Sequence, residues 1–344
     1  MRILITGASG TIGSALLKQL GEQSERHDIT VFDIETRQSR RLFSSYQNRI
    51  KIFFGDITRQ DDVDAACSDQ DVIIHLAAII PPLADRYPDL ARRVNVDGTR
   101  HVLSAMQRLS PGAFLCYASS IAVYGDRIKD PEIRVTDPLQ VSQGDAYAES
   151  KIATEALIRN ASVDWTIFRL TAIMGVKNHK VSGIMFHMPL NTPLEIATPE
   201  DAARAFLHAI ENRALLTKKV FNLGGGPLCR IRYHEFIQRS FRLFGLGKLN
   251  FPALAFARKN FHCGYYLDGD ELENILHFRR DTIESYFSRI KRSVPEIRKW
   301  FTYMFCIAIK RHLLRLSEPW KALRTKDSTL IRRFFGEETL PVLK

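Results

Sequence analysis

The stretch Arg2-Ile-Leu-Ile-Thr-Gly-Ala-Ser-Gly-Thr-Ile-Gly13 decides the fold of this chain. Its apolar start, Ile3 to Ile5, predicts a buried strand, and residues 14–20 predict the helix that follows. Glycines at this spacing between a strand and a helix are typical of a dinucleotide-binding turn. The first turns the chain, the second admits phosphate oxygens, and the third lets the helix pack on the strand. We expect the turn and the helix N-terminus to bind a pyrophosphate through Gly7, Gly10, Thr11, Ile12 and Gly13.

A second apolar run, residues 29–32, ends in Asp33, which lies about 20 residues beyond the last glycine. A carboxylate at this spacing binds the adenosine ribose hydroxyls and repels a 2′-phosphate, so the sequence predicts NAD as the cofactor. Arg37, Arg40 and Arg41 leave NADP as the alternative. The glycines alone are also compatible with a tight turn that binds no ligand, and Asp33 argues against that reading.

The run Asp145-Ala-Tyr-Ala-Glu-Ser-Lys151 supplies the expected proton-transfer group. Residues four apart share one face of a helix, so the Lys151 ammonium can lie beside the Tyr147 hydroxyl. We expect this positive charge to favour phenolate and to lower the tyrosine pKa from its usual value of about 10. Tyr147 would then be a general acid/base that exchanges a proton with a sugar or alcohol oxygen while a hydride moves at carbon.

With these motifs, residues 1 to about 290 resemble the extended short-chain dehydrogenase/reductase family, in its nucleotide-sugar epimerase and dehydratase group. The run Ala118-Ser-Ser-Ile-Ala-Val-Tyr-Gly125 matches the family's Ser-x-x-Val-Tyr-Gly signature, and the resemblance makes Ser120 the third catalytic residue and a substrate contact. The run Asn95-Val-Asp-Gly-Thr99 matches the family's Asn-Val-x-Gly-Thr. By the same resemblance, the further cofactor contacts are Asp56, Ile57, Leu76, Ala77, Ala78, Asn95, Tyr147 and Lys151.

Short apolar runs alternate with helical stretches along the chain, which predicts an α/β fold. We expect a Rossmann-type doubly wound parallel sheet with strands near residues 2–6, 28–33, 50–54, 71–76, 113–118, 165–172 and 219–223. The expected domains are a dinucleotide-binding domain at 1–175, completed by about 197–225, a smaller substrate-binding lobe at 176–196 and 226–290, and a basic helical C-terminal extension at 291–344.

The five cysteines, at 67, 116, 229, 263 and 306, form no CxxC pair and no metal-ligand spacing. Their odd number argues against a disulfide framework, so we expect a reducing cytoplasm and no metal site. Met1 leads directly into a strand, and we expect no signal peptide. The longest apolar stretch near the C-terminus, residues 300–309, falls short of the roughly 20 residues of a membrane-spanning helix. We expect a cytoplasmic homodimer.

The C-terminal extension is strongly basic. Residues 289–344 contain 14 Lys and Arg against 5 Asp and Glu, whereas the other 288 residues contain 35 against 33. Aromatic residues lie among the basic ones, a mixture that favours a helix on an anionic membrane surface over nucleic-acid binding. We prefer a helical extension packed on the body or on another subunit to a membrane contact, because apolar residues at helical spacing usually belong to a core.

The residues after Ser120 bear on the reaction. Ile121 and Ala122 stand where the family's 4,6-dehydratases carry an acid pair, and apolar side chains cannot perform acid/base work. The remaining possibilities are an NAD-dependent sugar-nucleotide epimerase, which the resemblance favours, and a dehydrogenase or reductase of a non-nucleotide alcohol or ketone. A non-catalytic dinucleotide-binding regulator is disfavoured, because it would not require Ser120, Tyr147 and Lys151 together.

Three positions concern the sugar nucleotide. By the resemblance, Leu194 replaces an arginine that binds the substrate diphosphate, and Ala172 replaces a sugar-binding asparagine. Arg258 lies in a stretch that resembles the one carrying a second diphosphate arginine, and the planar guanidinium suits two phosphate oxygens. The alternative for Arg258 is a solvated surface residue. The segment between Gly175 and Pro193 is short for the family, which implies a more open sugar pocket.

Overall fold

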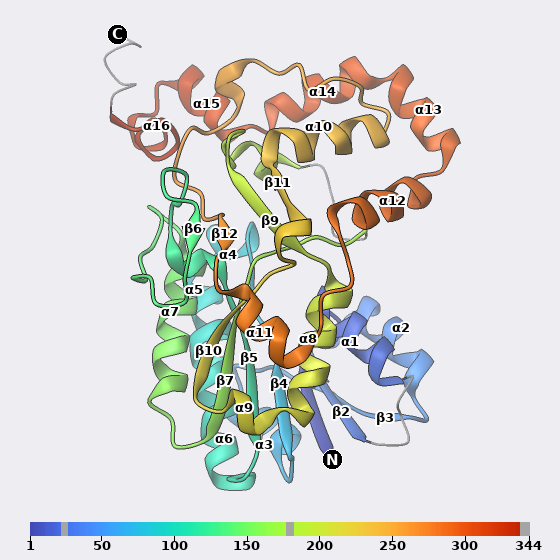
Figure 1. Ribbon diagram of the computed structural model, residues 1–344, viewed down its shortest axis with the longest axis vertical. Helices are drawn as coiled ribbons and strands as arrows, with labels where there is room; N and C mark the ends of the chain where they lie inside the picture. Colours follow the sequence, from blue (N-terminus) through green and yellow to red (C-terminus); the bar gives the residue numbers. More distant parts are fainter. Residues whose placement is uncertain (22–26, 177–181, 338–344) are drawn as a thin grey trace.

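A seven-stranded sheet, in the order β10-β7-β5-β4-β1-β2-β3, forms the centre of the computed structural model, which describes residues 1–21, 27–176 and 182–337 (Figure 1). All neighbouring strands in it are parallel. The strands are β1 (Arg2–Thr6), β2 (Asp28–Asp33), β3 (Ile50–Phe54), β4 (Val72–His75), β5 (Phe114–Ser120), β7 (Asp164–Leu170) and β10 (Lys219–Leu223). The predicted fold class is confirmed, and each predicted strand ends within two residues of the observed one.

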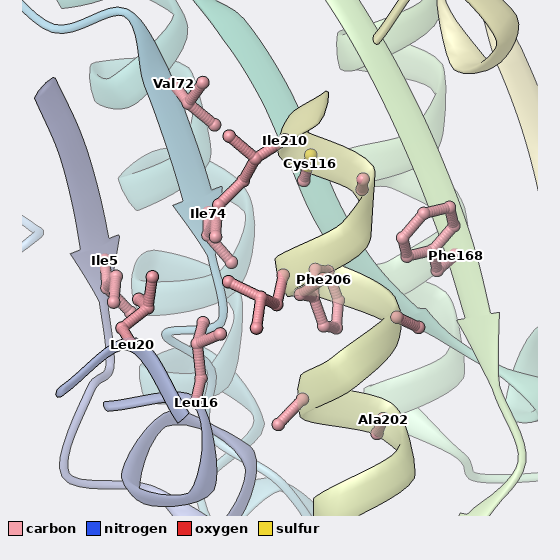
Figure 2. Packing of buried hydrophobic residues seen from close by; sticks show 14 of the residues in the cluster. Ile5, Leu16, Leu20, Val72, Ile74, Cys116, Phe168, Ala202, Phe206 and Ile210 are labelled. Carbon is pink, nitrogen blue, oxygen red and sulfur yellow. The ribbon is translucent and has the colours of Figure 1, made fainter. Parts of the chain in front are cut away.

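Helices cover both faces of this sheet because successive side chains of each strand point to opposite faces. Ile3 and Ile5 pack in one apolar cluster with Leu16 and Phe206, whereas Leu4 belongs to the cluster on the other face. Figure 2 shows part of the first cluster, where side chains of α1 and α8 meet those of the central strands. The helices on this face are α1 (Thr11–Gly21), α2 (Arg37–Phe43) and α8 (Pro199–Glu211), and those on the other are α3 (Gln60–Cys67), α6 (Gly98–Leu109) and α7 (Ala146–Arg159).

A smaller lobe stands at the carboxyl end of the central strands (Figure 1). Its sheet pairs β8 (Ala172–Ile173) in parallel and β11 (Arg230–Arg232) in antiparallel with β9 (Pro193–Ala197). Its own apolar core is rich in aromatic residues from α10 (Tyr233–Leu243) and α12 (Ile283–Ser293). The remaining elements before α12 are short helices and strands. They are η1 (Ser44–Tyr46), α4 (Leu83–Arg86), α5 (Pro88–Arg92), η2 (Arg93–Asp97), η3 (Ile121–Tyr124), β6 (Glu132–Ile133), η4 (Gly183–Phe186), α9 (Arg213–Leu216), η5 (Pro227–Cys229), η6 (Ala253–Ala255), β12 (Tyr265–Tyr266) and α11 (Gly269–Leu276).

The C-terminal extension is helical and lies at the end of the molecule that carries α10 (Figure 1). Its helices are α13 (Glu296–Met304), α14 (Cys306–Arg315), α15 (Glu318–Thr325) and α16 (Ser328–Phe335). Leu313 of α14 is buried in the core of the lobe, and Ser317 Oγ donates to the backbone oxygen of Ala255 at 2.7 Å. The backbone N–H of Arg258 donates to the oxygen of Phe334 at 2.8 Å. By contrast, α13 buries none of its residues.

We propose the domain division expected from the sequence, with the small sheet and its helices as the substrate-binding lobe. The extension after residue 290 would be a further layer on that lobe, since α14 to α16 pack against it. Within the described ranges, no helix combines the length and the apolar character needed to cross a membrane.

Candidate active site

A cavity of about 410 Å³ opens where β1 and β4 are neighbours at the carboxyl end of the sheet. Ligands of doubly wound sheets bind at such switch points, because the connections leave the two strands in opposite directions. The cavity extends from the glycine turn to α7. The predicted site residues among its lining are Gly7, Gly10, Thr11, Ile12, Gly13, Leu76, Ala78, Ser120, Tyr147 and Lys151.

The glycine turn leaves no room for side chains. Gly7 has a φ of +69°, and a Cβ there would lie 2.7 Å from the Cα of Ala77. A Cβ at Gly13 would lie 2.6 Å from the Cα of Ala8, so the start of α1 packs directly on the backbone of the turn that precedes it. The first turn of α1 therefore presents its backbone N–H groups to the cavity, as an anionic diphosphate requires.

Asp33 lies beside this turn, at the end of β2, and is not among the described residues that line the cavity. Its carboxylate accepts the backbone N–H groups of Ser9 at 2.7 Å and of Ile34 at 2.8 Å. These bonds fix the carboxylate next to the glycine turn, where a ribose diol could reach it.

Ser120, Tyr147 and Lys151 come together on the other side of the cavity. Ser120 ends β5, and its Oγ accepts the backbone N–H of Ala122 at 3.2 Å. Tyr147 lies in the first turn of α7, which Asp145 caps by accepting the N–H of Ala148 at 2.9 Å. The side chains of Tyr147 and Ser120 both line the cavity, and the serine acts to lower the pKa of the tyrosine. The two hydroxyl side chains thus lie across the cavity from the glycine turn, which precedes them by more than 100 residues in the chain.

Residues 3–224 match the NAD dependent epimerase/dehydratase family. This chain belongs to that family. Its cofactor is NAD, and the glycine turn and Asp33 fit it, since the glycines line the cavity and the carboxylate is held beside the turn.

Several relatives in this family are dehydrogenases or dehydratases. The chain is 26% identical to D-erythronate dehydrogenase of Cupriavidus necator over 258 residues, which cover 65% of this chain and 77% of that one. It is 32% identical to a sterol-4-alpha-carboxylate 3-dehydrogenase of Candida albicans over 164 residues, 46% of each chain. It is 31% identical to dTDP-glucose 4,6-dehydratase of Mycolicibacterium smegmatis over 163 residues, 46% of this chain and 48% of that enzyme.

Solved structures share the fold over nearly their whole length. The dTDP-glucose 4,6-dehydratase DesIV of Streptomyces venezuelae has a TM-score of 0.71 at 21% identity, covering 87% of this chain and 98% of its own. The UDP-glucose 4-epimerase of Thermus thermophilus, in complex with NAD, has a TM-score of 0.68 at 17% identity, covering 86% of this chain and all of its own.

The protonation of the Tyr-Lys pair differs from the expectation. Burial raises the pKa of Tyr147 to about 12, against the lowering effect of the hydrogen bond with Ser120. Burial also lowers the pKa of Lys151 to about 7, against the raising effect of Glu155. The predicted fall in the tyrosine pKa is therefore wrong for the protein without ligands. Desolvation is the largest cause of the raised tyrosine pKa, and the Lys151 Nζ donates to Tyr117 Oη at 3.0 Å and to the backbone oxygen of Ala118 at 2.6 Å rather than to Tyr147.

Asn95 connects two segments that border the cavity. Its side-chain oxygen accepts the N–H of Ile79 at 2.8 Å, and its nitrogen donates to the oxygen of Ile79 and to Ser150 Oγ, both at 3.0 Å. It thus ties the loop after β4 to the helix that carries Tyr147. Asn95 is not among the described lining residues, so the structure places it as a residue that positions the site.

Three other predicted cofactor contacts also lie outside the lining. Ile57 is buried against Gly98, and Asp56 Oδ1 accepts the N–H of Thr58 at 2.9 Å. Ala77 supplies backbone opposite Gly7. These three stay predictions for the adenine and ribose ends of NAD.

A buried ion pair under the site was not found from the sequence. The guanidinium of Arg169 donates to Glu155 at 2.7 and 3.0 Å, and both side chains are 1% exposed. Ser119 Oγ also donates to Glu155 at 2.6 Å, next to the catalytic Ser120. This pair joins β5, α7 and β7, and removing one partner would leave a buried charge, which typically costs about 3–5 kcal/mol.

The smaller lobe and the extension also supply lining residues that the sequence did not indicate. They include His187, Asn260, His262, Arg333 and Phe334. His262 Nδ1 lies 2.9 Å from Asp145 Oδ2, so the lobe contacts the cap of the catalytic helix. In the sequence, only the polar or aromatic side chains of these residues indicated that they could line a site. Their positions along the chain do not indicate that they lie near Ser120 and Tyr147.

The predicted substrate arginine is not brought to the cavity. The side chain of Arg258 is exposed and is not among the described residues that line it. Leu194 is fully buried in the core of the lobe. Within the described ranges, no group of His, Cys, Asp and Glu side chains has the arrangement of a metal site.

Proposed function

We propose that this chain interconverts a secondary alcohol and a ketone, with Tyr147 as general acid/base. The observation that carries the proposal is the meeting of Ser120, Tyr147 and Lys151 with the glycine turn in one cavity. When bound, NAD supplies the acceptor for the hydride that leaves the carbinol carbon. Tyr147 takes the hydroxyl proton in that direction and returns it in the other, and Ser120 holds the same oxygen.

The protonation state of Tyr147 decides whether it can first donate or first accept a proton. With a pKa of about 12 it is protonated near neutral pH, so it can donate to a carbonyl oxygen at once. Acting as a base requires loss of that proton, which a positive charge nearby would favour. Lys151 is the nearest candidate among the lining residues, with its Nζ 5.7 Å from the Tyr147 ring centre.

Two net reactions fit this chemistry. In the sugar-nucleotide epimerase expected from the sequence, the ketone turns over and the hydride returns to its other face, so no reduced cofactor accumulates. In a dehydrogenase of a non-nucleotide alcohol, reduced cofactor is a product. The positions of Leu194, buried, and Arg258, exposed away from the cavity, favour the dehydrogenase, because neither supplies a cation for a diphosphate. D-erythronate dehydrogenase, whose match covers 65% of this chain, is a relative of this class.

The experiment is an absorbance assay of reduced cofactor. Purified protein with NAD is incubated with sugar nucleotides and, separately, with non-nucleotide secondary alcohols. Reduced cofactor that accumulates with an alcohol supports the dehydrogenase. Conversion of a sugar nucleotide to its epimer without accumulation supports the epimerase. If neither class reacts or exchanges hydrogen with the cofactor, the proposal is refuted.

We further propose that α13 contacts an anionic membrane surface. We also propose that the protein is a homodimer in solution and that it resides in the cytoplasm. Large apolar side chains of α13 and its C-terminal end are half or more exposed, including Trp300 at 56% and Tyr303 at 67%. Arg298, Lys299 and Arg311 lie among them and complement an anionic surface. Light scattering of the purified protein measures its molar mass in solution and so tests the homodimer.

A further inference from the structure

A second cavity, of about 320 Å³, lies beyond Ser120 on the side of the smaller lobe. It shares Ser120, Thr171, Ile173, Ile184, Phe261 and His262 with the first cavity, so the two meet at the catalytic serine. The volume of the second cavity lies within the roughly 300–1,000 Å³ of pockets that hold small molecules.

The lining of this second cavity is apolar. Methionine, isoleucine, phenylalanine and alanine side chains surround it, from η3, β8, η4, α10 and the residues that follow β8 and η4. They are Ile121, Ala172, Met174, Met185, Met188, Phe236, Ile237 and Phe241. Methionines adapt to the shape of an apolar ligand, because their unbranched side chains have several rotatable bonds.

The polar atoms of this lining are already bonded within the protein. Tyr233 Oη donates to the backbone oxygen of Met185 at 2.8 Å, and Ser240 Oγ donates to that of Phe236 at 2.8 Å. Thr171 Oγ1 donates to the oxygen of Glu195 at 2.6 Å. Each of these three hydroxyls therefore has a backbone acceptor, whereas the hydroxyl of Ser120 stays at the junction with the first cavity.

The residue types of this lining also favour an uncharged ligand. Among the described residues that line the second cavity there is no Lys, Arg, Asp or Glu, and His262 pairs with Asp145. A diphosphate there would lose its hydration without gaining a cation, which is strongly unfavourable. An apolar group would gain from leaving water.

We propose that the second cavity binds an apolar group joined to the reacting carbon, so that the substrate is a hydrophobic secondary alcohol or ketone with an alkyl or alicyclic body. This inference rests on the proposed alcohol–ketone chemistry at Ser120 and Tyr147. It names the substrate class of that site, and it places the body of the substrate between η4 and α10.

The first test measures binding of straight-chain methyl ketones, from about four to about ten carbons, to the NAD-loaded protein by titration calorimetry. Each methylene that enters an apolar site gains about 0.8 kcal/mol, so the affinity should rise roughly fourfold per methylene until the cavity is full. An affinity that does not depend on chain length would overturn the inference.

The second test narrows the cavity. Ala172→Leu adds apolar bulk to its wall, and Ala214→Leu, on an exposed part of α9, makes the same chemical change outside both cavities. We expect the ratio of long-chain to short-chain affinity to fall at least tenfold in Ala172→Leu and to stay within about twofold of the wild type in Ala214→Leu. An unchanged ratio in Ala172→Leu would overturn the inference.

A third arm separates this inference from the proposed reaction. Chain-length-dependent binding without turnover would refute the proposed reaction and leave the apolar site standing. Turnover of a sugar nucleotide whose binding is weakened by Ala172→Leu would refute the apolar site and leave the hydride chemistry standing.

Discussion

Tyr147 is the residue on which the proposed proton transfer depends. Tyr147→Phe removes the hydroxyl and keeps the ring in its half-buried place, so we expect kcat to fall by roughly 10²- to 10⁴-fold while NAD binding is retained. Steady-state kinetics and a cofactor titration measure the two effects. Near-normal turnover in this variant would contradict the mechanism. Loss of NAD binding would mean that the hydroxyl supports the fold or the cofactor rather than the chemistry.

Asp33 is the residue that we expect to select NAD over NADP. Asp33→Ala removes both a ribose contact and the repulsion of a 2′-phosphate, so NAD should bind more weakly and the preference over NADP should narrow. Asp33→Asn is the matched control, because an amide oxygen can still accept the N–H of Ser9 without the charge. A wild-type protein that already prefers NADP in titrations would show that the basic residues after Asp33 decide instead.

Lys151 gives the protein a pH-dependent stability. Its pKa falls from 10.5 in the unfolded chain to about 7 in the fold, so between these values the unfolded state binds more protons. The free energy of unfolding of the NAD-free protein should therefore rise with pH across this window. Lys151→Met removes the buried charge, and its stability advantage over the wild type should shrink from about pH 7 to about pH 10 in denaturant titrations. An advantage that grows with pH would contradict the assigned burial effect.

At the scale of single elements, α13 differs from the rest of the extension because it buries none of its residues. We expect full-length protein to float with anionic liposomes at low salt and to be released by salt, since basic residues near such a surface contribute about 1 kcal/mol each. Exchanging Trp300, Phe301 and Phe305 for serine should abolish flotation without changing the melting temperature, because all three are at least half exposed. Liposome binding that survives this exchange would discard α13 as the contact.

The helix α7 illustrates which element-level features can be predicted from local residues. On a helix, the four-residue spacing puts Tyr147 and Lys151 on one face, and the segment is helical from one residue before Tyr147. The Asp145 cap follows from the preference for a carboxylate at a helix start. The bond from Lys151 to Tyr117 could not be predicted in this way, because it joins α7 to a strand 34 residues earlier.

At the scale of the whole molecule, the extension and the active site are connected. Arg333 and Phe334 of α16 line the cofactor cavity, and Phe334 and Phe335 are buried. Truncation after residue 326 should therefore lower the melting temperature and weaken substrate binding, whereas truncation after residue 337 keeps every described helix and should change neither. Calorimetric unfolding and ketone titration of both truncations are the measurements. Unaltered stability and binding in the shorter protein would show that α16 is dispensable.

The sequence by itself determined the central sheet, the glycine turn and the residue types of the catalytic set. These features depend on neighbours within a few residues: apolar runs become buried strands, and a turn at the switch from strand to helix requires glycine at Gly7 and Gly13. The predicted strands and family follow from such local patterns, and both are confirmed.

Only the tertiary structure decided which distant residues surround these motifs. Packing brings the Glu155–Arg169 pair under Ser120, places Phe334 at the cavity and leaves Arg258 on the surface. It also decided the pKa of Tyr147, because burial depends on the whole surrounding shell, whereas the sequence showed only the lysine four residues away. Long-range contacts and desolvation are properties of the packed chain, so no local pattern encodes them.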